Sequence, residues 1–137
     1  MLNIIDVFTF VGVAFVSNRE NFPIHERMFI VFLFASSLYM LTVLIIHGIL
    51  RKNGMLPSRL EHSYTMKLLF FIITVLLIGI LLYHFHAHRF LCRPNAFSWF
   101  SATEYGIAVA NMGFHLTAAY DFQDVILTTT LQKSRAD

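Results

Sequence analysis

The stretch KLLFFIITVLLIGILLYHF (67–85) decides the fold, because almost every residue in it is apolar. A helix needs roughly 20 such residues to cross a hydrocarbon core of about 30 Å. Three further apolar segments accompany it, at 4–16, 28–50 and 97–120, and the last two reach the spanning length easily. Only 13% of the 137 residues are charged, against roughly 25% in an ordinary soluble domain. The sequence therefore predicts an all-α, polytopic integral membrane helix bundle of about four helices.

We expect one membrane-spanning domain over 1–128 and a short cytosolic tail over 129–137. The chain length suits one compact bundle without a separate soluble domain. The formal net charge of +2 is a modest basic excess that needs no nucleic acid to explain it. The helices are expected at about 2–17, 24–51, 64–87 and 97–121.

The first apolar segment is too short to cross a membrane. It lacks the basic start and the small-residue cleavage site of a signal peptide. If Ser17 marks one membrane surface, Asp6 lies about 17 Å deep at 1.5 Å per residue. The charged amino group of Met1 would then lie within the bilayer, where a charge is costly. We therefore expect a chain that starts partway through a helix, as an N-terminally truncated form.

The basic residues of the connections predict the orientation of the bundle. Six of them lie in 51–67 and the tail, and four lie in 18–27 and 86–96. The positive-inside rule places the richer side in the cytosol, so 18–27 and 86–96 are expected to face the lumen or the exterior. The single cysteine, Cys92, then lies on the oxidising side, where thiols usually pair. Its partner is either missing from this chain, or the thiol is free.

Three polar residues interrupt the last apolar segment at helical spacing. Glu104, Asn111 and His115 are seven and four residues apart, so they fall within about 20° of one another around a helix. Such a seam either holds helices together by hydrogen bonds or lines a solvated cavity. An amide would hold helices together without the cost of a charge. Glu104 therefore favours the cavity, whereas Asn111 fits either role.

Two aspartates also lie in or next to the apolar segments, Asp6 in the first and Asp121 at the end of the last. Asp6 lies far from either membrane surface, so it should face the bundle and meet a partner. His115 and Asn111 are both candidates, and the sequence does not choose between them. Asp121 ends the last segment, where an interfacial anion that merely closes the helix is one interpretation.

A second cluster of polar residues gathers on the expected lumenal side, in NRENFPIHERMF (18–29) and YHFHAHRFLCRP (83–94). His84 and His88 share a helix face and have a spacing at which two histidines can chelate zinc. Neither an HExxH motif nor a CxxC pair supports a metal, and histidines at headgroup depth are the commoner case. Arginine binds phosphate through paired hydrogen bonds, and His25 or His88 beside it could serve as a general base for ester chemistry.

Three motifs together resemble one family: VSNRENFPIHERMFIVF (16–32), HRFLCRP (88–94) and EYGIAVANMGFHLTAAYDF (104–122). The chain resembles the post-GPI attachment to proteins factor 2 family, in the wider group that contains the damage-regulated autophagy modulators. The likeness runs from about Leu2 to Leu127, and the family's proteins are longer. His84 and His86 do not match family positions, which weakens the metal hypothesis. The matching positions are Glu20, His25, Glu26, His88, Cys92, Glu104, Tyr105, Asn111, Met112, Phe114, His115, Thr117, Asp121 and Phe122.

The resemblance implies a role in remodelling the lipid of glycosylphosphatidylinositol (GPI) anchors, at the step that gives the lyso-anchor a saturated acyl chain. It also implies a multi-pass protein of the Golgi or endoplasmic reticulum membrane. Expected partners are the anchor lipid, the membrane and other GPI-remodelling proteins, but no nucleic acid. No bound cofactor or metal is expected, although acyl-CoA or a phospholipid would donate the acyl group. We assign catalysis to His25, His88 and Glu104, and lipid or headgroup binding to Glu20, Glu26, Arg89, Asn111, His115 and Asp121.

Other functions stay open at this point. The protein could be a non-catalytic subunit that binds or presents lipid to an enzyme. It could be a transporter or proton relay built from Asp6, Glu104 and His115, or a regulatory scaffold of the autophagy-modulator type. No Gly-rich phosphate loop or nucleophile elbow is present in the sequence to identify an enzyme class.

Overall fold

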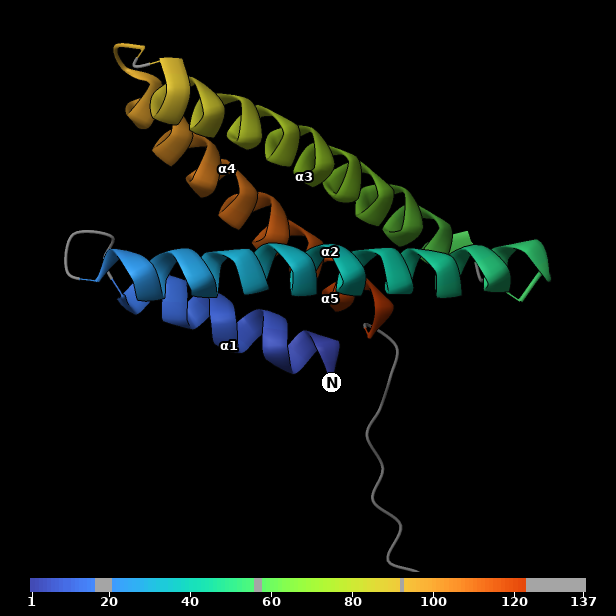
Figure 1. Cartoon of the computed structure of the whole chain (residues 1–137). Helices are drawn as coiled ribbons and strands as arrows, with labels where there is room; N and C mark the ends of the chain where they lie inside the picture. Colours follow the sequence, from blue (N-terminus) through green and yellow to red (C-terminus); the bar gives the residue numbers. More distant parts are fainter. Residues whose placement is uncertain (17–20, 56–57, 92, 123–137) are drawn as a thin grey trace, which may run out of the picture.

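The structure is a computed structural model that describes residues 1–16, 21–55, 58–91 and 93–122, with the backbone alone at 58, 59 and 120. This part of the chain is helical and contains no strand: α1 (Leu2–Phe15), α2 (Phe22–Lys52), α3 (Ser58–Leu91), α4 (Ala96–Leu116) and the short α5 (Ala118–Asp121). α1 packs on α2 and α4 packs on α3, so the fold consists of two helical hairpins that meet where α2 contacts α3 (Figure 1). The predicted all-α bundle is confirmed.

Two helices are long and apolar enough to cross a membrane, α2 and the Leu60–Leu91 part of α3. Only 33% and 11% of their most apolar windows are buried inside the protein. The central helix of a soluble protein would be mostly buried, whereas these helices expose large apolar side chains on their outer faces. Exposed apolar surface of this extent is typical of a lipid-facing helix. The chain is therefore a membrane protein.

α4 has the length that was predicted for a membrane-spanning helix, but it lacks the apolar character. Its 21 residues span about 31 Å, but it is not among the helices that are apolar enough to qualify as a span. The polar seam, with Glu104, Asn111 and His115, lowers the mean hydropathy of this helix. α4 is thus a helix whose polar groups need protein partners.

The helix ends follow from a few local residues. The Asn21 side chain caps α2 by accepting a hydrogen bond from the Ile24 N–H at 3.4 Å, and Pro23 occupies the first turn, where its missing N–H costs nothing. Gly54 ends α2 with a φ of 67°, the left-handed conformation that glycine adopts without strain. Asn95 reaches the same region, with a φ of 64°, between α3 and α4, and asparagine tolerates it better than most residues.

The predicted helix over 97–121 is wrong in one respect, since it breaks at Thr117. The Thr117 hydroxyl donates to the Phe114 carbonyl at 2.6 Å, and the Thr117 N–H is shared between the Gly113 and Phe114 carbonyls. A side chain that bonds to the preceding turn competes with the regular helix. α3 is also longer than the predicted 64–87, because polar residues on both sides of the apolar run continue the helix. The predicted tail lies outside the described residues.

Close contact between α3 and α4 depends on small residues of α4. A Cβ atom added at Gly113 would lie 2.5 Å from Cε1 and 2.6 Å from Cζ of the Phe70 ring. Gly79 is also helical, but a Cβ added there would meet no protein atom within 4 Å. The two glycines therefore make a matched pair for testing this contact.

We expect Gly113→Ala to destabilise the protein by about 1–3 kcal/mol, because a rigid ring must move to admit the methyl group. Gly79→Ala should be neutral or stabilising by about 0.5–1 kcal/mol, since alanine is the better helix former. The measurement is the melting temperature of each purified variant in detergent micelles. Equal melting temperatures for the two variants would contradict this account of the α3–α4 contact.

Candidate functional site

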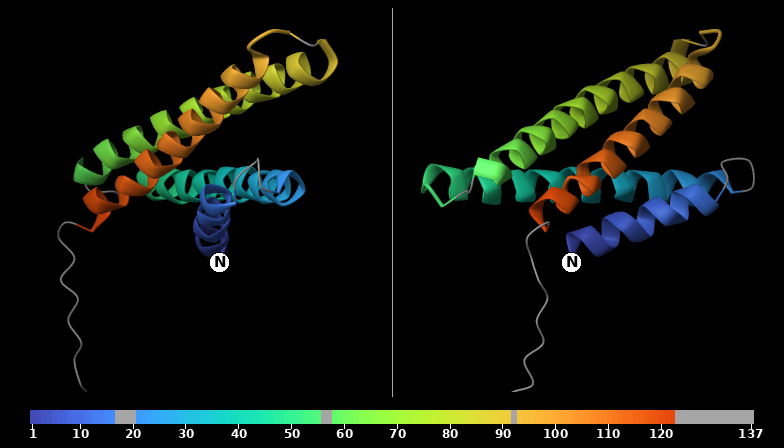
Figure 2. Two further views of the ribbon diagram at one scale, coloured as in Figure 1. Left: turned by 90° about the vertical axis from the view of Figure 1, so that its left-hand side faces the viewer. Right: turned by 180° about the vertical axis from the view of Figure 1, so that it is seen from behind.

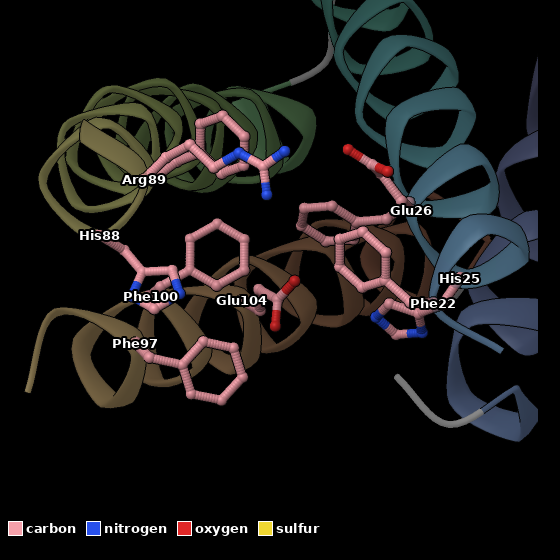
Figure 3. Close-up of a pocket in the computed structure, with 10 residues that line it drawn as sticks. Phe22, His25, Glu26, His88, Arg89, Phe97, Phe100 and Glu104 are labelled. Atoms are coloured by element: carbon pink, nitrogen blue, oxygen red, sulfur yellow. The ribbon is translucent and has the colours of Figure 1, made fainter. Parts of the chain in front are cut away.

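A cavity of about 190 Å³ lies at the end of the bundle where α1 leads into α2 and α3 leads into α4. Its polar lining comes from three helices: His25 and Glu26 of α2, His88 and Arg89 of α3, and Glu104 of α4 (Figure 3). All five are among the predicted site residues, and up to 79 positions separate them in the sequence. Five phenylalanines complete the lining: Phe22, Phe29, Phe85, Phe97 and Phe100.

Helical spacing explains why these side chains converge. His25 and Phe29 are one turn apart on α2, and Phe100 and Glu104 are one turn apart on α4, so each pair shares a helix face. The His25 ring lies parallel to the Phe29 ring, with centroids 6.4 Å apart. The aromatic rings form an apolar wall around a few polar groups, which is the usual composition of a small-molecule site.

His25 is oriented by the backbone. Its Nδ1 atom lies 2.7 Å from the Val16 carbonyl oxygen, at the end of α1. A carbonyl only accepts hydrogen bonds, so Nδ1 carries the proton and donates it. In the neutral ring the lone pair then resides on Nε2, which is the atom a general base needs. Figure 3 shows the Glu104 carboxylate projecting into the same cavity, between His25 and Phe100.

This cavity, named the polar cavity for the five polar residues above, continues into a larger groove of about 730 Å³. We name it the apolar groove because the residues that it does not share with the cavity are mainly apolar. The two share four residues: His25, Phe29, Phe97 and Glu104. The groove follows α4 from Phe97 to Met112, about 22 Å at 1.5 Å per residue, between that helix and α1 and over α2. Its other lining residues are Phe10, Val13, Ala14, Phe32, Ser101, Tyr105, Ala108 and Val109.

A buried polar cluster ties α1, α2 and α4 together in the middle of the bundle. Asp6 is fully buried, and its Oδ2 atom lies 2.8 Å from Nε2 of His115. Asn111 Nδ2 donates to both carboxylate oxygens of Asp6, at 3.3 and 3.4 Å, and to Ser36 Oγ at 2.6 Å. The prediction that Asp6 faces the bundle and meets His115 or Asn111 is confirmed, with both as partners. Ser36, which was not among the predicted site residues, is a further member.

The single seam predicted along α4 is divided between two sites. Glu104 lines the cavity with His25, whereas Asn111 and His115 bind Asp6 and line neither cavity. The reason is that α1 diverges from α4 towards the polar cavity and meets it at Asp6, beside Asn111 and His115. The headgroup role predicted for those two residues therefore has no support from their position.

Asp121 lies in a third cluster, at the far end of α4 and α5 from the polar cavity. Its Oδ2 atom is 2.7 Å from Lys67 Nζ and 3.9 Å from His47 Nε2, while Ser63 Oγ donates to Oδ1 at 2.7 Å. Ser63 also accepts from Lys67 Nζ at 2.5 Å. The interpretation of Asp121 as a mere interfacial anion is wrong, because its charge is paired with a lysine that is 2% exposed.

Sequence reasoning missed Lys67, which it counted only as a loop charge. A usable signal existed, because Lys67 opens the purest apolar run and Ser63 precedes it by one helical turn. Two other predicted residues, Glu20 and Cys92, lie outside the described residues. His84 stacks on the Trp99 ring, with ring centroids 6.2 Å apart, and does not line the cavity. Among the described residues, no group of three or more His, Cys, Asp or Glu side chains could hold a metal ion.

Comparison with known proteins identifies the family that this chain matches. The model of the family described as Frag1/DRAM/Sfk1/Cwh43P N-terminal domain matches residues 1–125. "Post-GPI attachment to proteins factor 2-like" of Drosophila melanogaster is 43% identical over 89% of this chain and 38% of its own length. "Acyltransferase PGAP2" of Xenopus tropicalis is 31% identical over 89% and 48%. "Post-GPI attachment to proteins factor 2" of Caenorhabditis elegans is 27% identical over 94% and 49%.

The chain thus spans less than half of the length of these three relatives. No solved structure matches it.

Proposed function

The chain belongs to the Frag1/DRAM/Sfk1/Cwh43P family, and from this premise we propose that it is a GPI-anchor lipid remodelling factor of the secretory pathway. It acts at the step that gives the lyso-GPI anchor a saturated acyl chain, and so supports surface expression of GPI-anchored proteins. Its place is the Golgi or endoplasmic reticulum membrane, which it crosses several times, with the polar cavity on the lumenal side. The names of the relatives, a post-GPI attachment factor and an acyltransferase, support both the anchor as substrate and the acyl transfer.

The observation that carries this proposal is the junction between the polar cavity and the apolar groove. A lyso-anchor has an inositol phosphate at the membrane surface and an acyl chain within the leaflet. Arg89 and His88 line the polar side, where they can bind the phosphate by charge-assisted hydrogen bonds. The groove offers the apolar surroundings that an acyl chain requires.

His25 stands where these two parts meet and acts as the general base. The free hydroxyl of the lyso-lipid gives its proton to Nε2 of His25, and its oxygen forms an ester bond with the carbonyl carbon of the acyl donor. The bond from that carbon to the leaving sulfur of acyl-CoA, or to the leaving oxygen of a phospholipid, breaks. The leaving group then takes the proton from His25. Glu104, across the cavity, stabilises the imidazolium that forms in between.

The test is acyl transfer by the purified protein in lipid nanodiscs, supplied with lyso-GPI and either acyl-CoA or a phospholipid donor. Mass spectrometry measures the diacyl product. We expect turnover by the wild type and about a tenfold loss in Glu104→Gln, which keeps the size of the side chain and removes its charge. Lyso-GPI binding without turnover would instead support the non-catalytic lipid-binding role, and neither binding nor turnover would refute both.

A second measurement separates these roles from a scaffold. Cells that lack the homologous factor receive the wild type or the Glu104→Gln variant, and flow cytometry reports the surface level of GPI-anchored proteins. The proposal expects recovery with the wild type and reduced recovery with the variant at equal expression. Equal recovery by both would favour the regulatory scaffold.

A further inference from the structure

The apolar groove ends at the buried Asp6 cluster. We propose that this end makes the groove a gauge of acyl-chain length, with Ala108 of α4 and Val13 of α1 as the residues that determine specificity. The inference rests on the proposed function, because it takes the transferred acyl chain as the occupant of the groove.

The shape of the groove supports a limit on chain length. α1 and α4 are far apart at the end of the bundle that holds the polar cavity, and they converge towards the first turns of α1 (Figures 1 and 2). The lining of the groove stops at Phe10 on α1 and at Met112 on α4. One turn beyond Phe10, Asp6 joins the two helices through its bonds to Asn111 and His115.

The polar groups at the end of the groove support the same limit. Asp6 and Asn111 are 0% and 3% exposed, and Asp6 has hydrogen-bond partners from α4 while Asn111 also bonds to α2. An acyl terminus that pushed between them would leave buried polar groups without partners, which is far more costly than a lost apolar contact. A chain that stays between α1 and α4 must therefore stop above this bridge, so the depth of the groove limits its length.

The positions of Ala108 and Val13 suit them to set this limit. Both are partly buried and line the groove from opposite helices. Ala108 lies about 6 Å along α4 from Glu104, at 1.5 Å per residue, with Asn111 a further 4–5 Å along. A larger side chain at either position would shorten the groove in its stretch between Glu104 and the polar bridge.

The experiment measures acyl transfer to lyso-GPI from a series of saturated acyl donors of increasing length. Ala108→Leu should shift the preference to a donor with a shorter acyl chain. Transfer from the donor with the longest acyl chain should fall by about tenfold, which is the usual effect when at least one methylene group does not fit an apolar pocket. Val13→Phe, from the opposite wall, should shift it the same way and serves if Ala108→Leu does not fold. Ala102→Leu is the matched control, because Ala102 is exposed on the same helix.

A chain-length profile that stays unchanged in both variants, with turnover intact, would overturn the inference and leave the proposed function standing. If the wild type shows no turnover, the proposed function fails, and the length gauge is then decided by binding. In that case native mass spectrometry records which members of a lysophospholipid series of graded length bind to each protein. A shift towards shorter chains in Ala108→Leu supports the gauge, and identical binding profiles refute it.

Discussion

Replacing His25 with asparagine should reduce acyl transfer about 10²–10⁴-fold, the range expected for loss of a general base. The Nδ2 atom of asparagine can take the place of the histidine Nδ1, so the hydrogen bond to the Val16 carbonyl, 2.7 Å in the native protein, can still form. The variant lacks only the second ring nitrogen, which is the proposed base. The measurement is turnover of lyso-GPI by purified protein at saturating acyl donor, together with lyso-GPI affinity, which should change little.

His86→Ala provides the matched control for this prediction. His86 is exposed on α3 and does not line the cavity. Its ring contacts the Phe90 ring, with centroids 4.8 Å apart. Its removal should leave turnover within about twofold, as expected for a surface position without special contacts. If His25→Asn kept most of its activity while folding normally, His25 would not be the base, and His88 would be the next candidate in the same cavity.

The second large effect concerns stability, at the opposite end of the bundle. Lys67→Met should destabilise the protein by about 3–5 kcal/mol, because it leaves the carboxylate of Asp121 partly buried without its cation. Methionine keeps the length and the apolar stem of lysine, so little packing is lost. The measurement is the unfolding free energy of purified protein in detergent micelles, titrated with a denaturing detergent.

The double variant Lys67→Met with Asp121→Asn tests the cause. It removes both charges and retains an amide beside Ser63, so most of the lost stability should return. A double variant as unstable as Lys67→Met would show that lysine acts through packing instead. The acyl-transfer activity of folded Lys67→Met protein should be close to that of the wild type, because the ion pair is remote from the polar cavity.

Several features of this protein were accessible from the sequence because they depend on local properties. The apolar runs predicted the helices, and their few charges predicted a membrane protein. A carboxylate deep in an apolar segment predicted that Asp6 points inward and meets His115 or Asn111. The polar motifs 18–29 and 83–94 predicted that His25, Glu26, His88 and Arg89 belong to one end of the bundle, and the structure places these four around one cavity, together with Glu104.

Other features required the tertiary structure, because periodicity shows which residues share a helix face but not which helix that face meets. Glu104 and His115 share a face of α4, yet one faces the cavity with His25 and the other faces Asp6, since α1 is inclined to α4. Sequence reasoning counted Lys67 as a loop charge. In the structure α3 begins at Ser58, so Lys67 lies within the helix and contacts Asp121. The groove likewise depends on the divergence of α1 and α4, a packing relation between segments about 90 residues apart that neither segment encodes alone.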